Sequence, residues 1–266
     1  MNIPQTSAAP AAGARARTPF SKVPEATALF WVIKILTTGM GECVSDDLME
    51  RLDWWALGVG GAALVASLWW QFRTDRYRAW PYWTAVAMVS VFGTMVADGL
   101  RKGLGLTFVD TTIAFSVLVA ASLGTWYLSE RTLSIHSITT RRRETFYWAT
   151  VMATFALGTA VGDMFASTLG WGFLESGLGF CVLIVLPLLA YKFLGLNSVL
   201  AFWSAYVVTR PLGASFADYL WVPRPWGAGF GKDAVSLVSS TVFLLAVVYA
   251  AKTRNGEPKD ARAVAG

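Results

Sequence analysis

One spacing, W-x9-G-x4-D, occurs four times in this chain, and each time its Asp lies toward the end of an apolar stretch. The four copies share the same register without a gap, and an aromatic residue precedes each Trp. The copies are Trp31, Gly41 and Asp46; Trp83, Gly93 and Asp98; Trp148, Gly158 and Asp163; Trp203, Gly213 and Asp218. Internal repetition at a regular period indicates a fold made of equivalent structural units. The chain is therefore expected to consist of four tandem repeats.

Composition indicates the class of these repeats. The chain is 55% hydrophobic and 15% charged, whereas soluble domains average about 45–50% and about 25%. Eight apolar stretches approach the roughly 20 residues that cross a bilayer as a helix. They run at about 25–45, 55–72, 80–99, 108–128, 145–166, 174–193, 198–220 and 233–251, with ends uncertain by about 2–4 residues. The sequence predicts an all-α membrane protein with eight transmembrane helices, arranged as four parallel helical-hairpin repeats.

The basic residues predict the orientation of these helices. Fifteen of the 22 Lys and Arg residues fall in the termini and in the loops on the same side, and five fall in the opposite loops. The positive-inside rule then places both termini in the cytoplasm. We expect a flexible cytoplasmic tail over residues 1–22, a transmembrane domain over 23–252 and a disordered cytoplasmic tail over 253–266. The repeats are expected at about 30–75, 80–130, 145–195 and 200–252, again with uncertain ends.

The repeated Asp residues are the leading functional candidates. Because each repeat has an even number of spans, all four carboxylates are expected in one layer. Acidic side chains within a membrane are costly and usually functional. Glu42 lies one turn before Asp46 on the same helix face, and Thr94 and Thr159 stand at the equivalent positions. The candidate ion-binding or metal site is Glu42, Asp46, Thr94, Asp98, Thr159, Asp163 and Asp218. The alternative is that these Asp residues are structural helix-end caps.

Other repeated positions have simpler interpretations. The Trp residues are expected to anchor the protein at the membrane interface, and the Gly residues to allow close helix packing. A second acidic set, Asp110, Glu175 and Asp233, opens the even-numbered spans. Capping and a favourable helix dipole explain acids at such positions. A second ring of carboxylates outside the first is the alternative.

Two cationic side chains lie inside predicted spans. Lys34 is three residues past Trp31, close enough to the interface for its amine to reach water. Arg210 lies near the middle of the membrane, where it needs an acidic partner or an aqueous cavity. Pro211 follows it and is expected to kink the seventh span. We assign Lys34, Arg210 and Pro211 to gating or charge balance.

Several classes of function lack the residues that they require. His136 is the only histidine, and Cys43 and Cys181 have no metal-binding spacing, so no haem or zinc cofactor is expected. No nucleophile–base pair and no phosphate-binding loop is visible, so an enzyme is not expected. The net charge of +5 follows from the loops and does not indicate a nucleic-acid partner. Oxygen ligands without His or thiolate suit hard cations or protons.

The chain resembles a family of bacterial inner-membrane proteins of unknown function, built from four tandem two-helix repeats with a repeated Trp. The residues that carry the resemblance are Lys22-Val23-Pro24-Glu25, Phe30-Trp31 and Gly41-Glu42, and it extends over nearly all of residues 22–252. It implies a multi-pass protein of the bacterial inner membrane. A looser similarity is to repeat-built cation/proton exchangers, although Gly41-Glu42 with Asp46 does not reproduce their contiguous motif.

Two hypotheses of function follow. The first is a secondary transporter that exchanges a cation, in particular a divalent metal ion, for protons at the carboxylate layer. Ionised carboxylates that lie close together repel one another, and binding of protons or a cation relieves that repulsion. The second is a non-transporting membrane scaffold or regulator. The expected partners are the lipid bilayer, a small cation and, as an open alternative, further copies of the chain.

Overall fold

The computed structural model describes residues 20–258, and within them the chain forms eight α-helices and no strand. The helices are α1 Ala28–Leu52, α2 Trp55–Phe72, α3 Ala79–Leu104, α4 Phe108–Glu130, α5 Arg141–Asp163, α6 Gly172–Phe193, α7 Ser198–Trp221 and α8 Lys232–Thr253. A 3-10 turn, Ile135–Ser137, precedes α5, and a π-helical segment, Met164–Thr168, follows it. The all-helical prediction is confirmed. The main difference is that α1 and α3 continue past their repeated Asp.

Local capping explains several helix starts. The hydroxyl oxygen of Thr27 accepts from the backbone N–H of Phe30 at the start of α1, and Thr140 does the same for Arg143 at the start of α5. The amide oxygen of Asn197 accepts from the N–H of Val199 at the start of α7. Such side chains satisfy N–H groups that have no partner within the helix.

Seven of the helices are long and apolar enough to cross a membrane, within the part of the chain that the structure describes. The exception is α7, which carries Arg210 and Asp218 and is as long as its counterparts. Its polar side chains Thr209, Arg210, Ser215 and Asp218 are buried against other helices. A helix enclosed by protein needs fewer apolar residues than one that faces lipid. The chain thus has the make-up of a multi-pass membrane protein.

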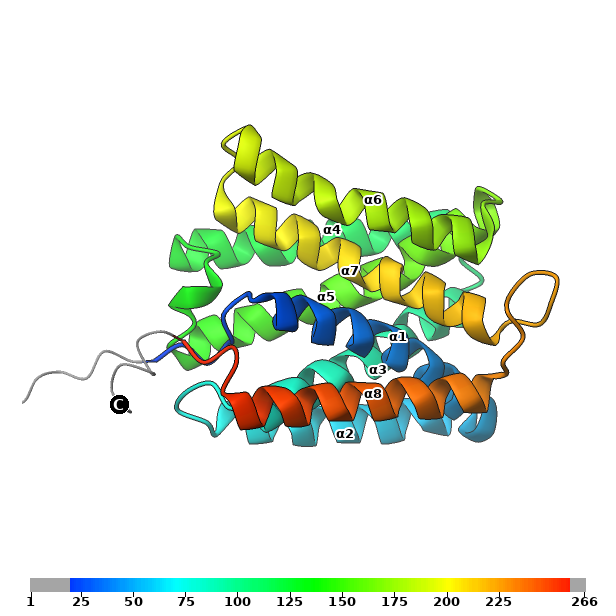
Figure 1. The fold of residues 1–266 in the computed structure, drawn as a ribbon, viewed down its shortest axis with the longest axis horizontal. Coiled ribbons are helices and arrows are strands. Elements are labelled where there is room, and N and C mark those ends of the chain that lie inside the picture. Colours follow the sequence, from blue (N-terminus) through cyan, green and yellow to red (C-terminus); the bar gives the residue numbers. More distant parts are fainter. Residues whose placement is uncertain (1–19, 259–266) are drawn as a thin grey trace, which may run out of the picture.

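The odd-numbered helices form a closed inner ring. α1 packs on α3, α3 on α5, α5 on α7, and α7 returns to α1. All four run in the same direction, from the end that holds residues 20 and 258, the first and last that the structure describes, toward the opposite end (Figure 1). We call these the terminal end and the acidic end, because the repeated Asp residues lie toward the latter. The parallel orientation of the repeats agrees with the sequence prediction.

The repeated Gly residues are the contact points of this ring. A Cβ atom added at Gly41, Gly158 or Gly213 would collide with a side chain of the next inner helix, and one added at Gly93 would make a tight contact of 3.0 Å. The pairs are Gly41 with Ser90, Gly93 with Phe155, Gly158 with Arg210, and Gly213 with Thr38. The second members also occupy one repeat position, eight residues before each Asp. The same contact therefore recurs at all four helix junctions, as expected for small residues in membrane bundles.

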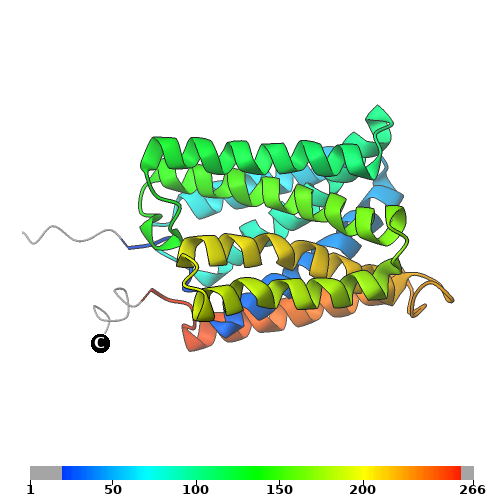
Figure 2. The same ribbon diagram turned by 90° about the horizontal axis from the view of Figure 1, so that it is seen from above.

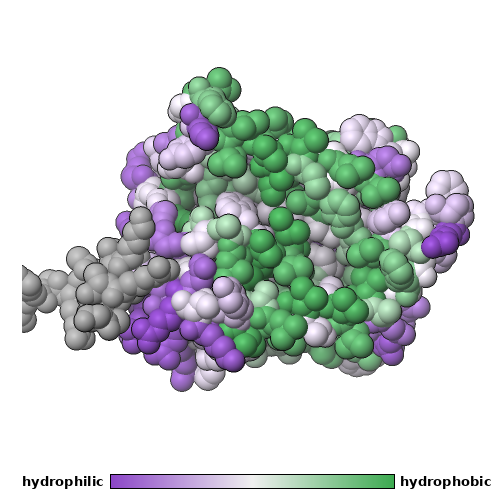
Figure 3. Space-filling view, viewed as in Figure 1, coloured by the Kyte–Doolittle hydropathy of each residue, from purple (hydrophilic) through white to green (hydrophobic). Residues whose placement is uncertain are grey.

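The even-numbered helices lie outside the ring and present apolar surface. α2, α4, α6 and α8 pack on α3, α5, α7 and α1, respectively, more extensively than on the helix that precedes each in the chain. The second helix of each hairpin therefore packs mainly on the following repeat rather than on its own first helix (Figure 2). Their exposed side chains include Val65, Val117, Val182 and Leu245. Figure 3 shows this apolar band between hydrophilic ends.

An aromatic layer fills the ring near the terminal end. Each residue before a repeated Trp contacts the Trp of the next repeat, with ring centroids 5.6 to 6.2 Å apart. The pairs are Phe30–Trp83, Tyr82–Trp148, Tyr147–Trp203 and Phe202–Trp31. The hydroxyls of Tyr82 and Tyr147 lie 2.6 Å apart. Trp83, Trp148 and Trp203 are buried, so the prediction that they are interface anchors is wrong.

The segments beside the termini pack on the terminal end. Lys22 is buried, and its Nζ donates to the Glu144 carboxylate at 2.7 Å. The backbone N–H of Glu25 donates to the carbonyl of Gly256 at 2.9 Å, which ties the two ends of the described chain together. The predicted tails at 1–19 and 259–266 lie outside the described residues. Within the described part, Lys22 and Gly256 are packed rather than free.

Candidate cation site

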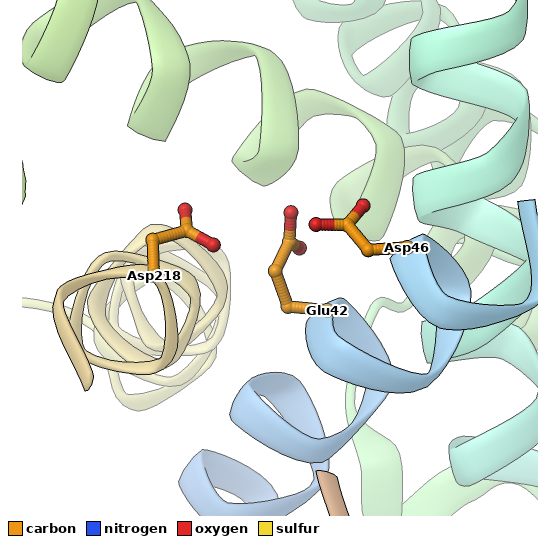
Figure 4. A group of neighbouring side chains, drawn as sticks. All are labelled: Glu42, Asp46 and Asp218. Atoms are coloured by element: carbon orange, nitrogen blue, oxygen red, sulfur yellow. The ribbon is translucent and has the colours of Figure 1, made fainter. Parts of the chain in front are cut away.

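Three carboxylates converge toward the acidic end of the inner ring. Glu42 and Asp46 project from α1 and Asp218 from α7, and one oxygen of each lies within 4.8 Å of the others. Figure 4 shows the three side chains directed toward one another. Glu42 and Asp218 are buried and Asp46 is half-buried. Oxygen ligands at this spacing suit a hard cation.

Arg210 is the partner of this acidic group. Its guanidinium forms an ion pair with Glu42 Oε2 and donates to the hydroxyl oxygens of Thr94 and Thr159, the latter at 2.9 Å. A second nitrogen donates to the backbone carbonyl of Thr38 at 3.1 Å. The predicted need for an acidic partner is met by Glu42. Thr94 and Thr159, predicted as cation ligands, instead bind the arginine.

Asp98 and Asp163 lie near the group without joining it at the same spacing. Asp98 Oδ2 is 3.3 Å from Lys102 Nζ. Asp163 ends α5 and interacts electrostatically with Glu42, Asp98 and Asp46. The four repeated Asp residues therefore share one end of the ring, but only two of them join Glu42 in the tight group. Asp46 and Asp98 lie inside their helices, six residues before the last helical residue, so the helix-end cap interpretation does not describe them.

A pocket of about 430 Å³ opens beside the carboxylates. Asp46 and Asp98 line it, together with Lys232, Trp221 and Glu50. Lys232 Nζ is 2.7 Å from Glu50 Oε2 and lies over the Trp221 ring, 4.5 Å from its centroid. Lys232 is one of the five basic residues that the sequence prediction put in the outer loops. No sequence motif marks it as part of the site, because it follows a long connection and comes close to α1 only in the folded chain.

Lys34 lies inside the ring rather than at the interface. It is 1% exposed, and its Nζ lies 3.9 Å and 4.3 Å from the ring centroids of Phe155 and Tyr206. Among the described residues its amine has no hydrogen-bond partner. The prediction that the amine reaches water is wrong. The helix that carries Lys34 is enclosed by α3, α7 and α8, which leaves the amine no short route to the surface.

Two backbone irregularities lie near the site. Pro211 is inside α7, which continues as a helix on both sides of it. Its ring packs against α5, where a Cβ at Gly158 would be 3.0 Å from the Pro211 Cδ. The π-helical segment Met164–Thr168 begins directly after Asp163. Such segments in α-helices occur often at functional sites, and no sequence pattern predicted this one.

The second acidic set lies at helix starts. Asp110 forms a capping box with Thr107 at the start of α4. Glu175 lies in the first turn of α6. Asp233 lies in the first turn of α8, and its Oδ1 is 2.7 Å from a guanidinium nitrogen of Arg51. All three thus occupy the first helical turns that the capping interpretation requires, and none belongs to the group of Glu42, Asp46 and Asp218.

Comparison with known proteins identifies the repeats. A family model described as a Repeat of Unknown Function (DUF347) matches residues 81–132, 146–195 and 201–255, together more than half of the chain. Helices α1 and α2 precede these matches, yet α1 carries the same Trp, Gly and Asp spacing and completes the inner ring. No curated protein and no solved structure matched the chain. The chain belongs to the DUF347 repeat family.

Proposed function

We propose that this protein is a secondary transporter that exchanges a hard divalent cation for protons. The observation that carries the proposal is the convergence of Glu42, Asp46 and Asp218 inside a ring of helices, with the buried guanidinium of Arg210 beside them. Asp98 and Asp163 add negative charge nearby. Ionisable side chains within apolar helical bundles are typical of ion and proton pathways.

The charges explain why an exchange is favoured over simple binding. Glu42 pairs with the guanidinium of Arg210, and four further carboxylates, those of Asp46, Asp98, Asp163 and Asp218, lie at the same end of the ring, so the empty, fully ionised site is repulsive. A divalent cation relieves that repulsion, and so does the addition of protons. Both cannot occupy the same carboxylate oxygens at once. Cation entry therefore releases protons, and proton entry releases the cation.

Arg210 is the internal counter-charge in this scheme. Arg210 stays paired with Glu42 whether or not a cation is bound. Its positive charge therefore balances one carboxylate between transport cycles. Because Thr94 and Thr159 also bind the guanidinium, a change at Glu42 is transmitted to α3, α5 and α7. We expect the ring to rearrange around this contact during transport.

Access from one end fits a carrier rather than an open channel. The pocket lined by Asp46 and Asp98 leads from the acidic end, while the aromatic layer of Tyr82, Tyr147 and their neighbours fills the other end. Alternate opening of two ends is the general scheme of transporters built from repeats. With cytoplasmic termini in a bacterial inner membrane, which the positive-inside rule supports, the pocket opens to the outside.

The test is transport by the purified full-length protein in liposomes. Mn²⁺, Mg²⁺ and Ca²⁺ influx and internal pH are recorded under an imposed pH gradient. We expect cation influx coupled to proton efflux, and its loss in Glu42→Gln. Asp110→Asn is the matched control, because Asp110 lies at the start of α4 outside the carboxylate group, and the amide oxygen of Asn can still accept from the backbone N–H of Thr107. If Glu42→Gln and the unaltered protein show equal cation flux, Glu42 is not part of the transport site. Absence of any cation flux favours the scaffold hypothesis.

A further inference from the structure

A second polar cavity lies at the terminal end, on the other side of the aromatic layer from the carboxylates. It has a volume of about 640 Å³. The end of α2, the loop 73–78 and the start of α3 form one wall, and the end of α8 with residues 254–258 forms the other. Neither the family match nor the proposed transport assigns it a role.

The cavity carries a surplus of arginine. Arg73, Arg76, Arg78 and Arg254 line it, against the two acids Asp75 and Glu257. Within the described residues, Arg73, Arg76 and Arg78 form no ion pair, although all three are exposed. The guanidinium of Arg73 lies over the Trp69 ring at 4.0 Å. Burial raises the pKa of the Tyr77 phenol, which also lines the cavity, to about 12. The phenol therefore adds no negative charge near neutral pH.

The other basic cluster at this end has an acidic partner. Arg142 and Arg143 both pair with the carboxylate of Glu130, at 3.2 Å and 2.8 Å. By contrast, Arg73, Arg76 and Arg78 line the cavity and form no ion pair among the described residues. Such guanidinium groups match the geometry and charge of a phosphate group.

The surroundings of the cavity indicate where the phosphate comes from. Trp70 and Trp80 line it and are 44% and 42% exposed, and Trp is enriched at the membrane interface. Exposed apolar side chains of α2 and α8, among them Val65 and Leu245, continue from it toward the middle of the molecule. A ligand with a phosphate head and acyl chains would contact both surfaces.

We propose that this cavity binds the headgroup of an anionic phospholipid through Arg73, Arg76 and Arg78. Basic pockets between helices at the cytoplasmic face are known to favour anionic headgroups. The site holds the lipid against α2, α3 and α8 and so fixes the terminal end of the bundle. This inference is independent of the proposed transport, because lipid binding is measured directly.

The test uses the full-length protein in detergent, titrated with phosphatidylglycerol or with phosphatidylcholine of the same acyl chains. Native mass spectrometry gives the bound fraction, and thermal unfolding gives the stabilisation. We expect phosphatidylglycerol to bind at least roughly tenfold more tightly. Arg73→Gln/Arg76→Gln should abolish that preference, and Arg142→Gln/Arg143→Gln should retain it although it removes the same charge.

Three outcomes would overturn the proposal. The first is equal binding of the two lipids to the unaltered protein, a result that does not depend on any variant folding. The second is an equal loss of preference in both double variants. The third is equal stabilisation by inorganic phosphate, which would identify a soluble anion as the ligand instead.

Discussion

Arg210 of α7 and Glu42 of α1 form an ion pair in the interior of the helix ring, where their side chains are 1% and 5% exposed. The same guanidinium binds Thr94 of α3 and Thr159 of α5. One side chain thus connects all four inner helices. A buried ion pair contributes little net stability, because desolvation opposes the attraction, but removing one partner leaves an uncompensated charge. The pair is therefore expected to fix how the helices are arranged.

Arg210→Gln is expected to destabilise the protein by about 3–5 kcal/mol, because Glu42 stays buried and loses the one ion-pair partner that it has among residues 20–258. Thermal unfolding in detergent measures the change. Arg210→Met/Glu42→Met should recover most of the stability, because neither charge is then left unpaired. That double variant should still lack transport.

The control for this prediction is Arg51→Gln, which removes an exposed ion pair with Asp47 and Asp233. Exposed pairs contribute little, so the melting temperature should change much less. If Arg210→Gln and Arg51→Gln have similar effects, Arg210 does not organise the ring.

The sequence predicted the helices and the functional end of the protein but not which side chains meet there. The apolar stretches located all eight helices, because length and composition determine whether a segment can span a bilayer. The repeat placed Asp46, Asp98, Asp163 and Asp218 at one end. Their different roles depend on the neighbours of each residue: Lys102 lies beside Asp98, whereas Asp218 is directed toward Glu42.

The burial of the repeated Trp residues could not be inferred from their position near helix starts. A Trp near the start of a membrane helix can be either an interface anchor or a core residue. The packing of the inner helices decides between them, because it places each Trp against the aromatic residue of the preceding repeat. The aromatic residue before each Trp was the available signal for burial. When two adjacent positions both recur in all four repeats, both are expected to make equivalent contacts in each repeat.

Gly213→Ala tests the close contact that closes the ring. A Cβ at Gly213 would lie 2.8 Å from the backbone oxygen of Ile35 and would also collide with the Thr38 side chain. A backbone atom cannot move aside as a flexible side chain can, so we expect destabilisation of roughly 1–3 kcal/mol. Gly124→Ala is the control, because nothing lies within 4 Å of its added Cβ. In that helix, Ala should be neutral or stabilising by up to about 1 kcal/mol. Equal melting temperatures for the two variants would contradict the closed ring.

Lys34→Met should leave the protein as stable or make it more stable. The Lys34 amine has no hydrogen-bond partner among the described residues, and an unsatisfied buried polar group costs about 1–3 kcal/mol. Lys22→Met is the matched variant, because Lys22 is also buried but is paired with Glu144. It should destabilise the protein. A lower melting temperature for Lys34→Met than for Lys22→Met would show that Lys34 has a stabilising partner.

The five carboxylates should differ in their effect on cation binding, and this difference tests the geometry of the site most directly. Asp46→Asn and Asp218→Asn each remove a charge from the group whose oxygens lie within 4.8 Å of one another. Each should weaken cation affinity by roughly 100-fold, because a cation is left undercompensated by about 3 kcal/mol or more. Asp98→Asn and Asp163→Asn act only through their electric field, so a loss of about tenfold or less is expected.

Binding of Mn²⁺ to the purified protein, measured by calorimetry, gives the affinities. If Asp98→Asn and Asp163→Asn prove more damaging than Asp46→Asn and Asp218→Asn, the cation binds elsewhere in the acidic layer.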